Sequence, residues 1–200
     1  NQITAFHPGA MSRSHENRVD EADQISIGIV SPDGRDGMIQ HAQQFAEAGI
    51  PFIFDPGQGM PMFNGEELMT FVEQATYVTV NDYEAQLLKE RTGRSLESLA
   101  EHVAGLIVTL GAKGSMIYTE GRVIEIPTAK PAAVADPTGC GDAYRAGLLH
   151  GLMNDMDWET TGRVASLMGA LKIAQPGTQN HSFTAQDFAK VFETSFGRSL

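Results

Sequence analysis

The sequence predicts an α/β fold, a three-layer sandwich in which helices cover both faces of a mostly parallel central sheet, with a β-hairpin at one side. Between residues 24 and 110, short apolar or alternating runs typical of strands alternate with segments of helical periodicity. Beyond Asp136 the pattern is helical only. Such alternation is typical of a parallel sheet that is buried on both faces, and ligands bind at the carboxyl ends of its strands.

The first half of the chain supplies the alternating elements. Gly49 followed by Pro51 is a stop signal that ends one helix just before an apolar strand. Asn64 with Glu67 three residues later is a capping pattern that opens the next helix. The predicted strands are 24–30, 52–54, 77–80 and 106–110, and the predicted helices are 36–48, 64–74, 82–91 and 95–103.

The second half supplies the hairpin and three further helices. Two short β-rich runs flank Glu120-Gly121, which is typical of a hairpin turn. The hairpin strands are 115–119 and 122–126, and the predicted helices are 141–153, 158–174 and 184–196. Helical spacing predicts that their core faces are formed by Leu148, Leu152, Val164, Leu167, Met168, Leu171, Phe188, Val191 and Phe192.

Composition limits the partners and the compartment. Twenty-five acidic residues against fourteen basic ones give a formal charge of −11, which opposes binding to nucleic acid or to anionic membrane surfaces. The single cysteine, Cys140, excludes an intrachain disulfide and fits a reducing compartment, so we expect a cytoplasmic protein. The six histidines are scattered, with no pair at metal-ligand spacing.

The run Asp136-Pro-Thr-Gly-Cys-Gly-Asp142 holds the strongest chemical signal. It places two glycines and a small residue at the start of a predicted helix, where exposed amide groups and the helix dipole attract anions such as phosphate. Asp142, at the edge of that turn, is well placed to accept a proton from a hydroxyl held against a γ-phosphate. From spacing alone, an ordinary glycine-rich turn with Asp136 and Asp142 as capping residues explains the run equally well.

Two further motifs follow predicted strands. Asn81-Asp-Tyr-Glu84 would place an amide and a carboxylate one turn apart, as suits hydrated Mg²⁺, although the same spacing is a common helix cap. Thr109-Leu-Gly-Ala-Lys-Gly114 has two glycines that would let a nucleotide approach the backbone, and a simple hairpin turn is the alternative. No Walker A sequence occurs in the chain, so a nucleotide would be held in another way.

In this order and spacing, the three motifs resemble the ribokinase-like family of sugar and nucleoside kinases, the phosphofructokinase B type. The resemblance covers most of the chain from Gln24 onward. It implies ATP and Mg²⁺ as cofactors, with K⁺ in many members, a small sugar or nucleoside as substrate, and it allows a homodimer. The resemblance assigns Asp142 as the catalytic base and the amides of Gly139, Cys140 and Gly141 as the anion hole. It assigns Asn81 and Glu84 as the motif that organises Mg²⁺ and phosphate through water, and Thr109, Gly111 and Gly114 as nucleotide-binding residues. Asp136, Thr138 and Gly177 fall in the region that binds a monovalent cation in many members.

The chain departs from this family in two ways. Family members are nearer three hundred residues, so we expect that about the first third is missing, that residues 1–10 are a remnant of the lid, and that residues 11–200 form the ribokinase-like ATP-binding and catalytic domain. Such a chain would bind ATP weakly without turning over a sugar. The second departure is Cys140, where alanine is more usual: either any small side chain serves there, or the helix start lowers the pKa of the thiol and makes it reactive.

We therefore predict an ATP-dependent kinase that transfers the γ-phosphate to a hydroxyl of a sugar or nucleoside, with a ribose-like compound or adenosine favoured. One alternative is a non-catalytic nucleotide-binding relative, or an inactive fragment of such a kinase. Another is a dinucleotide-dependent oxidoreductase, which the absence of Gly-x-Gly-x-x-Gly after the first strand disfavours.

Overall fold

The computed structural model describes residues 7–200, which form two compact units. The first unit runs to Val108 and includes Tyr118–Gly121, and the second comprises Thr109–Ile117 and Arg122–Leu200. Most of the expected lid remnant, 1–10, lies outside the described residues. A 3-10 helix begins within its last part, at Gly9, and the assignment of 1–10 to a lid stays a prediction.

Within the described residues, six strands pair in sequence order in one sheet, β1-β2-β3-β4-β5-β6. The pairs β1–β2 and β2–β3 are parallel, with Gly28 opposite Phe52 and Ile53 opposite Tyr77. Helices flank this mostly parallel sheet, which confirms the predicted fold class. The strands are β1 (Gly28–Val30), β2 (Phe52–Phe54), β3 (Tyr77–Asn81), β4 (Gly105–Thr109), β5 (Ser115–Thr119) and β6 (Arg122–Ile126).

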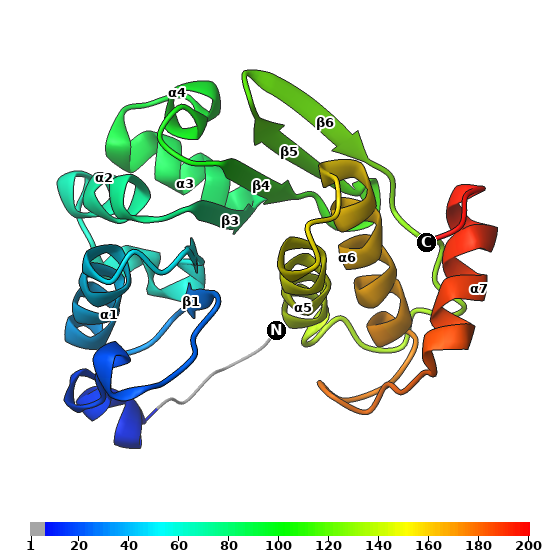
Figure 1. Cartoon of the computed structure of the whole chain (residues 1–200), viewed down its shortest axis with the longest axis horizontal. Helices are drawn as coiled ribbons and strands as arrows, with labels where there is room; N and C mark the ends of the chain where they lie inside the picture. The colour runs from blue at the N-terminus through cyan, green and yellow to red at the C-terminus, as the bar shows by residue number, and fades with distance from the viewer. Residues whose placement is uncertain (1–6) are drawn as a thin grey trace. The chain divides into compact units, whose positions relative to one another are not determined.

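The first unit packs its helices around buried strands, as the blue to green segments of Figure 1 show. All three residues of β2 are completely buried, and the ring of Phe54 stacks on that of Phe71 at 4.5 Å between centroids. A strand buried on both faces must be apolar throughout, which explains the run Phe-Ile-Phe. The helices are α1 (Arg35–Glu47), α2 (Gly65–Gln74), α3 (Asp82–Thr92) and α4 (Leu96–Ala100), with 3-10 helices η1 (Gly9–Glu16), η2 (Val19–Glu21) and η3 (Gly57–Met62).

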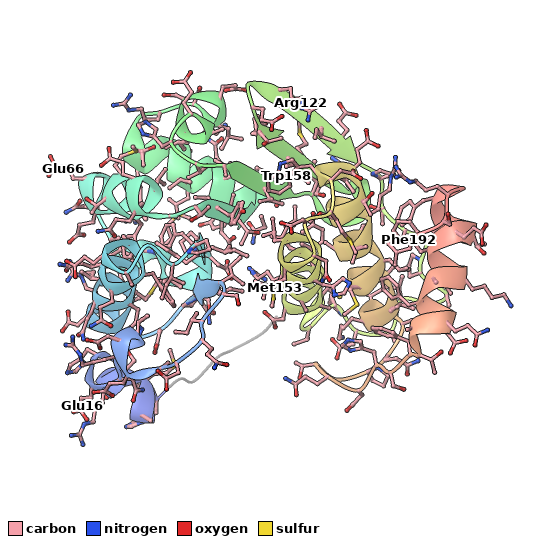
Figure 2. All side chains as sticks on the ribbon, viewed as in Figure 1. Glu16, Glu66, Arg122, Met153, Trp158 and Phe192 are labelled. Carbon is pink, nitrogen blue, oxygen red and sulfur yellow. The ribbon has the colours of Figure 1, made fainter. Side chains whose placement is uncertain are left out.

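The second unit carries three long helices, α5 (Cys140–Met153), α6 (Trp158–Ile173) and α7 (Ala185–Phe196), which lie side by side in that order in Figure 1. Helices α5 and α6 approach closely because Gly147 has no side chain: a Cβ there would lie 2.6 Å from Cα of Ala165. The unit also contains η4 (Gly111–Lys113) and the hairpin strand β6, whose first side chain, Arg122, is exposed and labelled in Figure 2.

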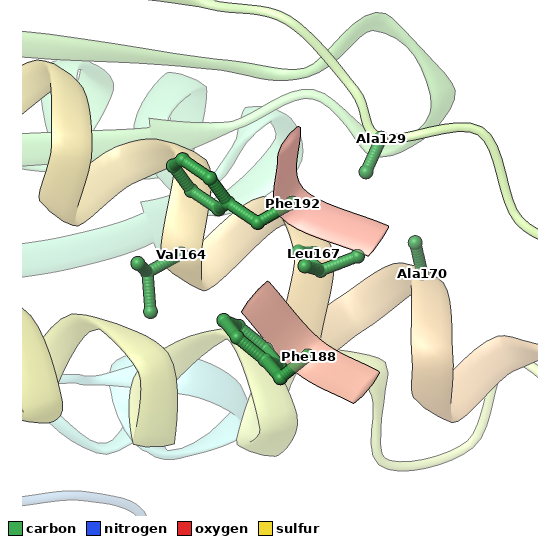
Figure 3. Close-up of a cluster of buried hydrophobic side chains, with 6 residues drawn as sticks. All are labelled: Ala129, Val164, Leu167, Ala170, Phe188 and Phe192. Carbon is green, nitrogen blue, oxygen red and sulfur yellow. The ribbon is translucent and has the colours of Figure 1, made fainter. Parts of the chain in front are cut away.

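Helix α7 is held on α6 by an apolar cluster (Figure 3). Its buried members are Ala129, Val164, Leu167, Ala170, Phe188 and Phe192. Most of the predicted core face is thus confirmed: five of its residues are buried, and Met168 and Leu171 pack against the cluster. Val191 was predicted wrongly, since its side chain is 38% exposed; Phe188 and Phe192, one turn apart, define the buried stripe, and Val191 lies at its edge.

Most predicted boundaries agree with the structure to within one residue, and two elements are shorter than predicted. The strand predicted over 24–30 is shorter in the structure, where only Gly28–Val30 is paired. Gln24 has a left-handed backbone conformation with φ of 58°, which an extended strand does not allow. The helix predicted over 95–103 ends at Ala100, and a turn carries the chain from there into β4 at Gly105. The short 3-10 helices, which carry no periodic signal of useful length, were not predicted. No helix among residues 7–200 is long and apolar enough to cross a membrane.

Candidate functional site

Helix α5 begins without a side-chain cap. Its N-cap residue, Gly139, has φ of +83°, and a Cβ there would lie 3.0 Å from the carbonyl oxygen of Thr178. Glycine is therefore required both by the left-handed backbone and by the close approach of the 178 segment. By contrast, capping side chains close the starts of α2, α3, α6 and α7 at Asn64, Asn81, Asp157 and Thr184.

The amide groups of this first turn are partly available to a ligand. The N–H of Cys140 donates to the carbonyl of Pro137 at 3.1 Å, and the N–H of Ala143 donates to Gly139 at 3.0 Å as the first helical bond. Within the described part of the second unit, the N–H groups of Gly139, Gly141 and Asp142 reach no protein acceptor. Of the three amides predicted to form an anion hole, those of Gly139 and Gly141 are thus available, whereas that of Cys140 is already engaged.

Asp142, the predicted base, is the third residue of α5 and is exposed, with 85% of its side-chain surface accessible. Its Oδ1 lies 3.7 Å from Nη1 of Arg145 in the next turn, a loose ion pair. The carboxylate therefore stands on the same turn as the available amides and is open to solvent.

A cavity of about 400 Å³ opens beside this helix start, within the range usual for small-molecule sites. Five predicted site residues line it together: Thr109, Gly111, Gly114, Cys140 and Gly141. The remaining lining residues come from the η4 turn, the segment after β6, and helices α5 and α6. They are Ala112, Thr128, Ala129, Pro131, Val134, Pro137, Tyr144, Ser166, Gly169, Ala170 and Ile173.

Polar groups in the wall of the cavity are mostly satisfied by the protein. The hydroxyl of Ser166 donates to the carbonyl of Pro127 at 3.0 Å and accepts the N–H of Ala129 at 2.9 Å. The hydroxyl of Tyr144 pairs with that of Ser115 at 2.7 Å, and burial raises the pKa of Tyr144 to about 12. The cavity consequently offers a mainly apolar wall, which suits a flat aromatic ring.

Asp136 ties the loop before α5 to the segment after α6. Its Oδ1 accepts the N–H of Thr138 and its Oδ2 accepts the N–H of Gly177, each at 2.9 Å, and its own N–H donates to Ile173 at 3.2 Å. These bonds, first those from Thr138 and then that from Gly177, lower the pKa of Asp136 to about 2, with a smaller contribution from Lys172. Asp136, Thr138 and Gly177, predicted as one region, are indeed brought together.

Lys172, in the last turn of α6, is a part of this region that the sequence did not reveal. Its side chain is completely buried, and Nζ donates to the carbonyl oxygens of Asp136 at 2.7 Å and Gln175 at 3.3 Å. A usable signal existed, because Lys172 is a lone charge in the otherwise apolar or small run 164–174. The spacing of Ser166, Gly169 or Ala170, and Ile173 on the same helix would likewise have indicated a single face of small or apolar residues.

Asn81 and Glu84 lie in the first unit, at the start of α3. The Oδ1 of Asn81 accepts the N–H of Glu84 and Oε2 of Glu84 accepts the N–H of Asn81, both at 2.8 Å, which forms a capping box. Asn64 and Glu67 form the same box at the start of α2, with both distances 2.9 Å. The geometry of Asn81 and Glu84 is therefore that of a helix cap, and it leaves Oε1 of Glu84 outside the box.

Of the two explanations for Cys140, the structure favours the small side chain over the activated thiol. Partial burial raises its pKa, and the carboxylate of Asp136 adds to that shift, while the ammonium group of Lys172 opposes it. Because the thiolate is the reactive form, a small side chain that fits the turn is the better account of Cys140.

An uncapped helix start beside a mainly apolar cavity places the chain in the class of α/β proteins whose sites can receive an anionic group together with an apolar ring. The comparisons name that class. The pfkB family carbohydrate kinases match residues 1–185, and the chain belongs to this family.

Several relatives are nucleoside kinases. The structure of Burkholderia thailandensis nucleoside kinase in complex with inosine is 52% identical with a TM-score of 0.97, and the match covers 100% of this chain and 65% of that one. The same enzyme in complex with ADP-inosine superposes with a TM-score of 0.96 and covers 62% of that chain. The nucleoside kinase of Methanocaldococcus jannaschii is 36% identical over 90% of this chain and 59% of its own length. The chain thus spans about three fifths of the length of these relatives.

Proposed function

We propose that this chain carries the ATP site and the phosphoryl-transfer centre of a nucleoside kinase. The supporting observation is that the cavity and the uncapped start of α5 share two residues, Cys140 and Gly141. The apolar cavity would take the adenine of ATP, and the first turn of α5 would receive the transferring phosphoryl group. The reaction would move the γ-phosphate of ATP to a ribose hydroxyl of the nucleoside.

The proposed step needs a base, an electrophile and a stabilised charge. A carboxylate oxygen of Asp142 takes the proton from the substrate hydroxyl as that oxygen bonds to the γ-phosphorus, and the bond from phosphorus to the β–γ bridging oxygen breaks to release ADP. The available N–H groups of Gly139 and Gly141 would stabilise the charge on the transferring group. The exposed position of Asp142 supports this role, since a base must meet a substrate that arrives from solvent.

Magnesium would bind chiefly through the phosphates of ATP. Among residues 7–200, no cluster of three or more His, Cys, Asp or Glu side chains could hold a metal ion directly. Glu84 fits an indirect role, because the capping box uses Oε2 and leaves Oε1 to accept a hydrogen bond from a metal-bound water. The ion itself would neutralise phosphate charge during transfer.

A purine nucleoside is the acceptor that we propose. The support comes from the relative that is most fully described by its ligands, the Burkholderia thailandensis enzyme, which is seen with inosine and with ADP-inosine. At 52% identity over the whole chain, the part of the acceptor site that this segment supplies is expected to be shared.

The experiment that tests the proposal separates binding from chemistry. MgATP, MgADP and NAD are titrated calorimetrically into the chain, and phosphoryl transfer is then followed with inosine, adenosine, ribose and fructose as acceptors. The same assay is run on the natural polypeptide if that extends beyond Asn1. We expect saturable binding of MgATP and MgADP, but not of NAD, to this chain, and transfer by the natural polypeptide to inosine in preference to the free sugars.

Two outcomes would overturn the proposal. If the chain binds NAD but does not bind MgATP, the kinase assignment is wrong, and a dinucleotide-dependent oxidoreductase is favoured instead. Binding of MgATP to the natural polypeptide, with no transfer to any acceptor, would favour a non-catalytic nucleotide-binding relative. Transfer to free ribose in preference to inosine would keep the kinase and change only the acceptor.

A further inference from the structure

Lys172 is a charged side chain buried without any exposed surface, next to the start of α5 rather than within the cavity. Lysine is almost never fully buried unless its ammonium group is paired, since removal of a charge from water is costly. The surroundings of this ammonium group therefore need a specific explanation.

The ammonium group is held by backbone oxygens. Nζ donates to the carbonyl of Asp136, just before α5, at 2.7 Å, and to the carbonyl of Gln175, just after α6, at 3.3 Å. It is close enough to the carboxylate of Asp136 to lower the pKa of that group. All three residues belong to the second unit. Carbonyl oxygens that converge on a positive charge, with a carboxylate nearby, are the surroundings typical of a bound alkali cation.

Each oxygen atom of Asp136 already has a hydrogen-bond donor, and the donor on its carbonyl is a cation. Its carbonyl oxygen receives Nζ of Lys172, and its two carboxylate oxygens receive the N–H groups of Thr138 and Gly177. The monovalent cation expected at Asp136, Thr138 and Gly177 consequently does not fit this chain, because a positive charge already stands on the carbonyl that would bind it.

We propose that the ammonium group of Lys172 is a tethered substitute for a monovalent cation. An ammonium ion has nearly the size of K⁺ and the same charge, and a lysine side chain presents it as a compact point charge. Held by Asp136 and Gln175, it joins the two segments that meet at Gly139, where a Cβ atom would lie 3.0 Å from the carbonyl oxygen of Thr178. The chain therefore needs no added K⁺ to keep the helix start of α5 in place.

Thermal unfolding tests the proposed role of Lys172 without any assay of activity. A failure of this proposal can therefore be distinguished from a failure of the proposed kinase function. The melting temperature of the wild-type chain is measured in the chlorides of K⁺, NH₄⁺ and tetramethylammonium at constant ionic strength. Lys172→Ala, Lys172→Met and Lys190→Met are measured in the same salts. Lys190 is the matched control, because its side chain is exposed on α7.

We expect the wild-type melting temperature to be the same in all three salts. Both Lys172 variants should melt roughly 4–10 °C lower, since buried oxygens lose their donor, whereas Lys190→Met should change little. K⁺ and NH₄⁺, but not the bulky tetramethylammonium ion, should restore part of the loss in Lys172→Ala, where space has been created for an ion. Lys172→Met keeps most of that space filled and should be restored less.

A saturable rise of the wild-type melting temperature with K⁺ would overturn the proposal, because it would reveal a separate cation site. Equal stability of Lys172→Met and wild type would overturn it as well, as would the absence of any K⁺ or NH₄⁺ effect on Lys172→Ala. If the Lys172 variants do not fold, the wild-type salt comparison still decides, since a substitute cation predicts no specific response to K⁺.

Discussion

Helices α3 and α5 both begin at motifs that the sequence marks as functional, yet they begin in opposite ways. Asn81 and Glu84 close the start of α3 with a reciprocal pair of hydrogen bonds, whereas α5 starts at Gly139 with no side-chain cap. A capping side chain occupies the amide donors that an anion would need. The comparison teaches that, of these two helix starts, only that of α5 leaves amide donors for an anion, and that Asn81 and Glu84 can act on a nucleotide only through the groups outside their box.

The largest effect should come from the carboxylate at the open helix start. Asp142→Asn keeps the shape of the side chain but removes the base, so we expect phosphoryl transfer to fall by about 10²–10⁴ while MgATP still binds. Single-turnover transfer to inosine, in a form of the protein that turns over, measures the rate, and calorimetry measures binding. A variant with wild-type turnover would show that Asp142 is only a residue of the helix start.

The next effect concerns the left-handed residue that opens α5. Gly139→Ala should lower the free energy of unfolding by roughly 1–2 kcal/mol through backbone strain, with more from the contact to Thr178, and it should weaken MgATP binding. Gly93→Ala is the matched control, because Gly93 also has positive φ, at the end of α3, but a Cβ there meets nothing within 4 Å. Urea unfolding and calorimetry are the measurements, and an equal loss of ATP affinity in both variants would contradict the role of Gly139.

A third test compares substitutions in the two capping boxes, at the starts of α2 and α3. Asn64→Ala and Asn81→Ala should each lower the free energy of unfolding by about 1 kcal/mol, since each removes the same N-cap bond. Only Asn81→Ala should also weaken the Mg²⁺-dependent part of ATP binding, measured as the difference between titrations with and without Mg²⁺. If the two variants behave alike in that difference, Asn81 and Glu84 are a helix cap and nothing more.

The smallest effect is a stabilisation by Asp136 that is lost only in acid. The pKa of Asp136 is lowered from 3.8 to about 2, so its contribution to stability is fully present above about pH 4 and is lost as the pH falls toward 2. Asp136→Asn should therefore be less stable than wild type near neutral pH, with the difference shrinking between pH 4 and pH 2. Melting temperatures across that range test this, and a difference that stays constant with pH would contradict it.

The sequence by itself determined the elements and the chemical character of this protein. The periodicity of apolar residues indicated which segments form strands and which form helices. The glycines and Asp142 of the 136–142 run indicated anion binding and a general base from their residue types alone. Residues 52–54, for example, form an apolar run after a helix stop signal, which favours a strand buried on both faces, and the structure has that strand.

The tertiary structure decided what depends on contacts between distant segments. Only the fold brings Nζ of Lys172 to the carbonyl of Asp136, thirty-six positions away, and only the fold shows that the amide of Cys140 is engaged while those of Gly139 and Gly141 are available. Burial and long-range hydrogen bonds are properties of the packed chain, so residue type alone could not reveal that Lys172 is enclosed or that the thiol of Cys140 has a raised pKa.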